Sequence, residues 1–152
     1  MNVELKAIIE QAQDRYLKAD DLSALESFIN SLPDRLSLYR TLRDREISFL
    51  QLVANQLEAE MPDTETKQLE TAIKQLSLVC RYSAMAMLMQ DQALVDQRLL
   101  KWLGQVATLQ ETQSLNQAMY GLFTKVLNKE LSRSQLELLN PFLNQAKTTL
   151  VA

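Results

Sequence analysis

The sequence predicts an all-α protein, a bundle of amphipathic helices, and three observations support this fold class. The chain of 152 residues holds only two glycines and three prolines, too few for a β-sandwich or barrel that needs a turn every roughly eight to twelve residues. Apolar residues recur at helical spacing along most of the chain. A chain of this length can bury a core without disulfides or metals, so we expect one domain over residues 1–152.

Residues 1–32 predict a helical hairpin. The apolar stripe of the first helix comprises Val3, Ala7, Ile8, Ala12 and Tyr16. Residues 18–21 offer capping side chains, and a second stripe runs from Leu22 through Leu25 to Leu32. Pro33 is expected to end this second helix, because proline lacks an N–H and disfavours helical geometry in the residue before it.

Residues 33–152 predict the core of the bundle. The expected elements are a long helix from Asp34 to Met61, a loop at 63–66, a central buried helix from Leu69 to Met89, a helix capped by Asp91 that stops near Gly104, a helix over 115–127, and a last helix that opens at Ser132 with Gln135 as its capping-box partner and bends at Pro141.

The composition argues against an enzyme. The chain has no histidine, which excludes imidazole bases and histidine-held metals. Cys80 lies in the predicted buried stripe and lacks a histidine to activate it, so we interpret it as a buried apolar side chain. The acidic residues lie on polar helix faces, and Met85, Met87 and Met89 point in different directions around one helix. We therefore expect no catalytic residue and no metal site.

Charge and hydropathy limit the partners. A net charge of -3 and a pI of about 5.0 disfavour nucleic-acid binding. No apolar run approaches the roughly 20 residues that span a bilayer, which predicts no transmembrane segment. The first residues carry charges and lack a signal-peptide pattern, so we expect a cytoplasmic protein.

Two segments resemble the phycobiliprotein family. Arg81 and Tyr82 match the Arg-Tyr pair that opens the second half of the family's central helix, and Asp91 matches the Gly-Asp step that ends it, with Gln90 in place of the glycine. Residues 96–100 match the acid-x-Arg-x-Leu arrangement that follows, and residues 16–25 resemble the Tyr-Leu hairpin segment. Residues 54–62 and the helix around Met119 and Phe142 also fall at comparable places, so the likeness covers nearly the whole chain.

The resemblance implies a globin-like core over 33–152, preceded by a hairpin with which family members dimerise. The family attaches its open-chain bilin to a cysteine nine residues before the Arg-Tyr pair, and that position is Ala72 here. Lys74 and Gln75 replace the arginine and aspartate that hold the pigment, and the loop between Pro62 and Ala72 is shorter than in pigmented members. The resemblance therefore implies that no bilin is covalently attached at the usual site.

The same resemblance implies candidate interface residues. Arg81 matches an arginine that contacts an acid of the first helix at the hairpin interface, where this chain has Gln13 beside Asp14. Arg81 is equally well interpreted as a surface residue beside Tyr82. The interface candidates are Tyr16, Leu22, Leu25, Arg81 and Tyr82.

Three functional hypotheses remain. The first is a non-enzymatic, chromophore-less protein that serves as a binding or assembly partner in cyanobacterial light harvesting or bilin metabolism, as a homodimer or with a related protein, in the cytoplasm or at the periphery of the thylakoid membrane. The second is a globin that binds a bilin noncovalently near Ala72, Lys74, Gln75, Lys101 and Trp102. The third is an unrelated helical adaptor domain with a convergent pattern.

Overall fold

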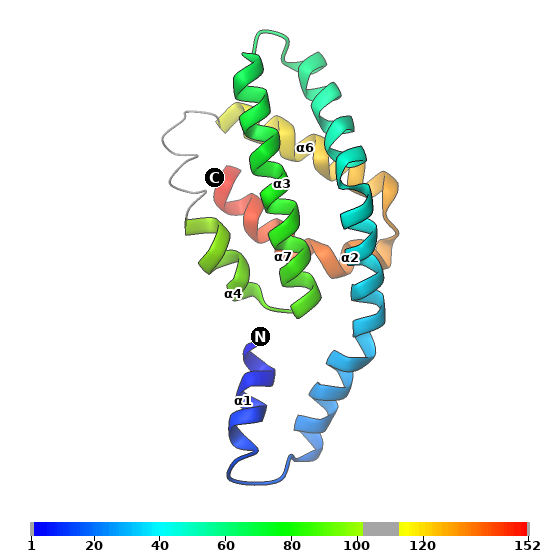
Figure 1. The fold of residues 1–152 in the computed structure, drawn as a ribbon, viewed down its shortest axis with the longest axis vertical. Helices are drawn as coiled ribbons and strands as arrows, with labels where there is room; N and C mark the ends of the chain where they lie inside the picture. Colours follow the sequence, from blue (N-terminus) through cyan, green and yellow to red (C-terminus); the bar gives the residue numbers. More distant parts are fainter. Residues whose placement is uncertain (1, 102–112, 152) are drawn as a thin grey trace.

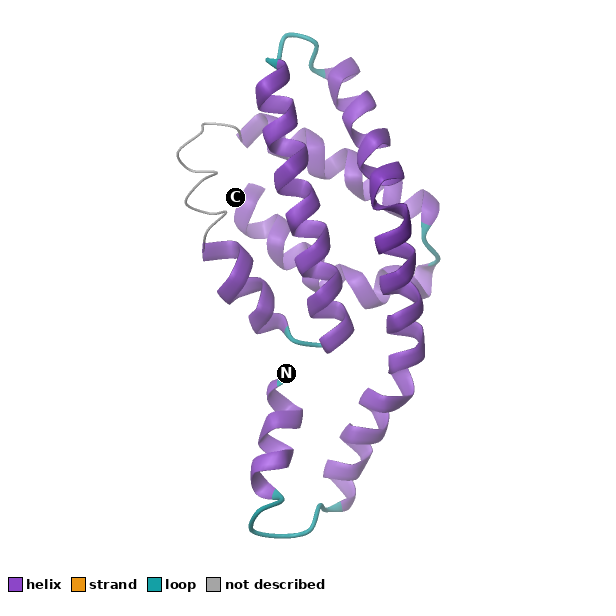
Figure 2. Ribbon diagram, viewed as in Figure 1, coloured by secondary structure: helices purple, strands orange, loops and turns teal. Residues whose placement is uncertain are grey.

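The computed structural model describes residues 2–101 and 113–151, with side chains described through Thr148. All regular structure in these residues is helical (Figure 2), which confirms the predicted all-α class. The helices are α1 (Val3–Gln11), α2 (Ala19–Glu60), α3 (Thr66–Met89), α4 (Gln92–Leu94), the π-helical η1 (Val95–Leu100), α6 (Gln113–Glu130) and α7 (Arg133–Val151).

The molecule is elongated because the hairpin projects from one end of the core (Figure 1). The hairpin consists of α1 and the first part of α2, and the rest of α2 runs along the core with α3 beside it. The central position predicted for the helix over 69–89 is confirmed, since α3 packs against α2, α4, η1, α6 and α7. Leu76, Val79 and Met87 of α3 are completely buried.

Pro33 does not end a helix, and this prediction was wrong. α2 is 42 residues long, contains Pro33 in its interior, and belongs to both the hairpin and the core. The ring removes one backbone hydrogen bond, but the Phe28 carbonyl in the turn before it accepts hydrogen bonds from Arg35 Nη2 at 2.6 Å and Ser31 Oγ at 3.1 Å. Side chains thus supply hydrogen bonds to the backbone near the proline.

The first helix buries a different stripe from the one expected. Leu5 and Ile8 are its buried residues, whereas Val3, Ala7 and Ala12 are exposed. Only Ile8 of the expected stripe faces the interior, because α2 covers a single narrow side of α1. The other apolar side chains of α1 remain open to solvent.

Two predicted helix starts are confirmed by their caps. Ser132 N–H donates to Gln135 Oε1 at 2.9 Å, and Gln135 N–H donates to Ser132 Oγ at 3.2 Å, which completes the expected capping box. Asp91 caps α4 by accepting the Ala93 N–H at 3.1 Å. The helix that follows changes to π geometry at Val95, and its expected stop at Gly104 lies outside the described residues. Pro141 lies inside α7.

Candidate functional site

A hollow of about 220 Å³ surrounds Ala72, near the end of the molecule where α2 joins α3. Ala72 is buried at its base, and Gln75 lines it one turn later. Asn116 of α6 closes the far side and is 3% exposed, with no hydrogen-bond partner for its buried Oδ1. Such an orphaned acceptor normally bonds a water molecule or a ligand.

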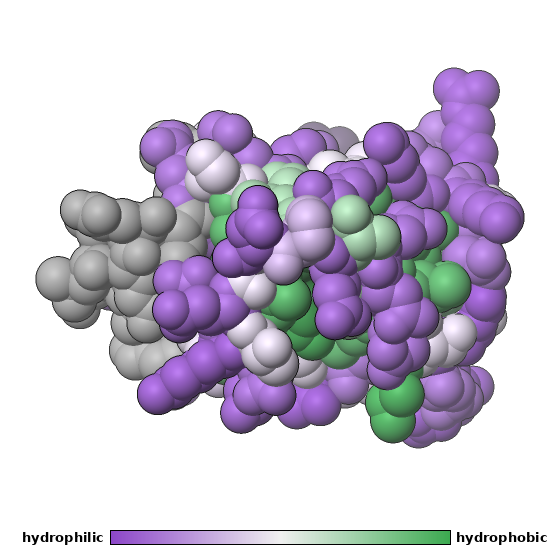
Figure 3. All heavy atoms as spheres, turned by 90° about the horizontal axis from the view of Figure 1, so that it is seen from above, coloured by the Kyte–Doolittle hydropathy of each residue, from purple (hydrophilic) through white to green (hydrophobic). Residues whose placement is uncertain are grey.

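The structure unites only part of the predicted bilin pocket. Ala72 and Gln75 share this hollow, but Lys74 and Lys101 are exposed and do not line it. Trp102 lies outside the described residues. Seen from the end that carries the Met61–Glu65 turn, the surface is mostly hydrophilic, and apolar atoms show in recesses between hydrophilic side chains (Figure 3).

Cys80, the one cysteine of the chain, lies on the α2-facing side of α3 and is 6% exposed. Burial raises the pKa of its thiol from 9.0 to about 12, and the negative charge of Glu46 adds to the effect. Because the thiolate is the reactive form of cysteine, this thiol is poorly suited to nucleophilic attack at neutral pH.

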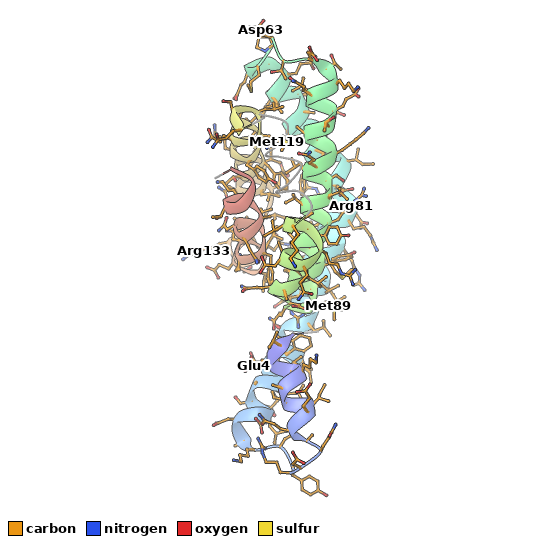
Figure 4. The ribbon with its side chains drawn as sticks, turned by 90° about the vertical axis from the view of Figure 1, so that its left-hand side faces the viewer. Glu4, Asp63, Arg81, Met89, Met119 and Arg133 are labelled. Atoms are coloured by element: carbon orange, nitrogen blue, oxygen red, sulfur yellow. The ribbon has the colours of Figure 1, made fainter. Side chains whose placement is uncertain are left out.

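Arg81 forms a two-pronged ion pair with Glu46 of α2. Its Nε donates to Glu46 Oε1 and its Nη2 to Oε2, each at 2.9 Å, and Ser77 Oγ donates to Oε1 at 3.2 Å. The arginine side chain is 65% exposed and lies on the side of the core (Figure 4). Arg81 and Glu46 line a hollow of about 240 Å³ between α2 and α3, with Cys80 and Tyr39.

The hairpin displays apolar side chains to solvent. Tyr16 at its tip is 98% exposed, and Leu22 and Ile29 of α2 are 45% and 53% exposed. Leu25 is half-buried, as is Tyr82 on α3. Hairpin and core therefore each carry predicted interface residues, but Gln13 and Asp14 have no contact with Arg81 within the chain.

A model of the family described as "Phycobilisome protein" matches residues 8–150. The chain belongs to this family. No curated protein sequence matches it. Phycobilisome proteins are all-α and globin-like, which confirms the predicted fold, and membership supports a light-harvesting-related role. The family is non-enzymatic, binds bilins and assembles into oligomers.

The described part of this phycobilisome protein was also compared with the requirements for a metal site and for a membrane-spanning helix. No group of three or more metal-ligating side chains lies together in residues 2–101 and 113–151. Over the same residues, no helix combines the length and apolar character needed to cross a bilayer.

Sequence reasoning missed two buried polar residues of this phycobilisome protein. Asn116 escapes a hydropathy pattern because it is polar, although it stands three and seven residues before the buried Met119 and Phe123. Arg35 is completely buried at the junction of hairpin and core, whereas arginine is rarely buried without a charged partner. Its position in the apolar pattern, three residues before Leu38, is the signal that could have indicated its inward direction.

Proposed function

We propose that this phycobilisome protein is a non-enzymatic assembly partner in light harvesting that docks through its hairpin and carries no covalently attached bilin. The observation that carries the proposal is the exposed apolar surface of the hairpin, formed by Val3, Ile9, Tyr16, Leu22 and Ile29. Apolar side chains exposed on a projecting element favour contact with another protein.

The position and the pKa of the single thiol support the absence of a thioether-linked pigment. Ala72, which stands where pigmented members have their cysteine, has no sulfur to form the bond. Cys80 is buried, and its raised pKa keeps the thiol neutral at cellular pH. A bilin therefore finds no reactive thiolate on the native protein.

Charge favours a second copy or a related globin as the partner. Between residues 2 and 34, seven acidic side chains stand against three basic ones. The hollow between α2 and α3 is lined by Arg43, Arg81, Leu42 and Ala84, and also by Glu46. Both arginines have acidic partners within the chain, Asp44 and Glu46. An acid of an acidic, apolar hairpin would compete with these carboxylates for the arginines.

The test replaces two exposed hairpin residues in the full chain, Leu22→Ser with Ile29→Ser. We expect sedimentation equilibrium at micromolar concentration to show an oligomer for the unaltered protein and a monomer for the double variant. Leu52→Ser is the matched control, because Leu52 is a 40% exposed residue of the same helix within the core. A wild-type protein that remains monomeric, alone and with a pigmented relative, would refute the proposal.

A second candidate function is noncovalent bilin binding at the Ala72 hollow, favoured by the unpartnered Oδ1 of Asn116. A pyrrole N–H is a donor of the kind that this oxygen lacks. Gln75 and Thr71 line the same hollow and offer further polar contacts.

Titration with biliverdin tests this candidate by the shift and sharpening of its absorption band. Ala72→Leu fills the hollow and should abolish the change, whereas Glu70→Leu, on an exposed position of the same helix, should leave it intact. An absorption spectrum that stays that of the free pigment would exclude the site.

A further inference from the structure

Arg35 is the largest completely buried side chain among the described residues. It lies on α2 two residues after Pro33, where the hairpin part of the helix passes into the core. Burial lowers the pKa of its guanidinium, and none of the ion pairs in residues 2–101 and 113–148 includes it. A buried charge without a counter-ion must be compensated by hydrogen bonds.

The guanidinium compensates by bridging two helices. Its Nη1 donates to the carbonyl of Leu88 in α3, its Nη2 to the carbonyl of Phe28 at 2.6 Å, and its Nε to Ser31 Oγ at 3.1 Å. The plane also lies over the Phe28 ring, 4.4 Å from its centre. Every nitrogen of the fork is therefore used.

The Leu88 carbonyl lies where a helix lacks donors of its own. α3 ends at Met89, and the N–H groups of Gln90 and Asp91 bond the carbonyls of Met87 and Ala86, so Arg35 provides for Leu88. Its positive charge also complements the negative end of the α3 dipole. On the other side, the Phe28 carbonyl lies in the turn before Pro33, next to the Ile29 carbonyl, whose helical donor the proline removes.

In residues 2–101 and 113–151, α2 is the main packing partner of α1. A cleft of about 460 Å³ lies between the start of α1, at Asn2 and Val3, and Met87 and Phe142 of the core. Figure 1 shows the hairpin hanging below the core, with α2 as the continuous connection.

We propose that Arg35 fixes the direction in which the hairpin leaves the core, and that it is thereby the positioning residue for docking. The second half of this inference rests on the proposed function, since only an assembling hairpin needs a defined direction. Without the bridge, the proline-weakened turn becomes a hinge.

The experiment measures hairpin-to-core distances by electron spin resonance, with labels on Glu26→Cys in the hairpin and Lys129→Cys in α6. Both positions are exposed, and native Cys80 is buried and stays unlabelled. Arg35→Met is compared with Arg40→Met, its matched control on an exposed position of the same helix.

Arg35→Met should broaden the distance distribution at least about twofold and weaken self-association about tenfold, because the hairpin then samples many directions. Arg40→Met should change neither. A distribution for Arg35→Met as narrow as that of the parent protein would overturn the proposal.

If Arg35→Met does not fold, as judged by the loss of a cooperative unfolding transition, the variant Arg35→Lys replaces it in the distance measurement. Lysine keeps the charge but lacks the planar fork that reaches two carbonyls, so broadening is again expected, and an unchanged distribution overturns the proposal. If the parent protein does not associate, the docking function fails, yet the distance measurement still decides the role of Arg35.

Discussion

The thiol of Cys80 stays protonated in the folded protein well above the pH at which it ionises in the unfolded chain. Desolvation is the main cause of the raised pKa, and Glu46 reinforces it. The unfolded thiol loses its proton near its ordinary pKa of 9.0, whereas the folded thiol keeps it up to about 12. Between these values the folded state binds more protons, so stability falls as pH rises.

We predict that the free energy of unfolding in urea decreases from pH 9 to pH 10 with a Cys80 contribution approaching about 1.4 kcal/mol per pH unit. Cys80→Ala should lower the stability at pH 8 but show a shallower pH dependence. Equal slopes for the two proteins would contradict the burial of an ionisable thiol. Tyr120, whose pKa burial also raises, is common to both proteins.

Gln90 is the C-cap of α3 and has a left-handed backbone conformation, with φ of 49°. It stands where the phycobiliprotein motif has glycine. A side chain in this conformation costs about 1–2 kcal/mol, partly offset because glycine is more flexible when unfolded. We predict that Gln90→Gly raises the free energy of unfolding by about 0.5–1 kcal/mol. Gln92→Gly, in the first turn of α4, should lower it, and the same sign for both variants would disprove this reasoning.

At the scale of the element, the sequence indicated helix ends well where the cap is local. The Ser132–Gln135 box and the Asp91 cap depend on side chains two or three residues away. α2 continues through Pro33, and nearby Arg35 contacts Leu88, 53 residues further along the chain. Local rules describe the cost of a proline but give no information on tertiary contacts beside it.

Asp21 stabilises the start of α2 in the hairpin. Its carboxylate accepts the Lys18 N–H at 2.9 Å and Arg15 Nη1 at 2.8 Å, and these contacts lower its pKa below 3.8. A carboxyl with a lowered pKa contributes stability above its unfolded pKa, and the contribution is lost as pH falls through the folded value.

We predict that Asp21→Ala lowers the hydrogen-exchange protection factors of the amides at the start of α2 several-fold, and that acidification below pH 3.8, the ordinary carboxyl pKa, lowers the same protection factors in the parent protein. Asp20→Ala is the matched control. Asp20 lies in the same first turn and is equally close to the helix dipole, but the hydrogen bonds from Lys18 and Arg15 go to Asp21, so Asp20→Ala should change exchange less. An equal effect of both substitutions would assign the stabilisation to the dipole instead of the hydrogen bonds.

At the scale of the whole molecule, the helical class followed from periodicity, whereas the arrangement of the site did not. Ala72 and Gln75 are three residues apart on α3, so their common face could be predicted. Asn116 joins them only because α6 folds against the start of α3 in three dimensions. Lys74 and Lys101 fit a bilin pocket by their charge, but charge alone does not predict the direction in which a side chain points.

The whole protein should remain free of covalent pigment even in a cell that produces bilins, because its only sulfhydryl is buried and neutral. We predict that the protein, coexpressed with bilin-producing enzymes and separated on a denaturing gel, shows no zinc-enhanced bilin fluorescence. Cys80→Ala should give the same dark band. Fluorescence that is present in the parent protein and lost in Cys80→Ala would reveal a thioether at Cys80 and would require the native core to open, since the thiol is otherwise inaccessible.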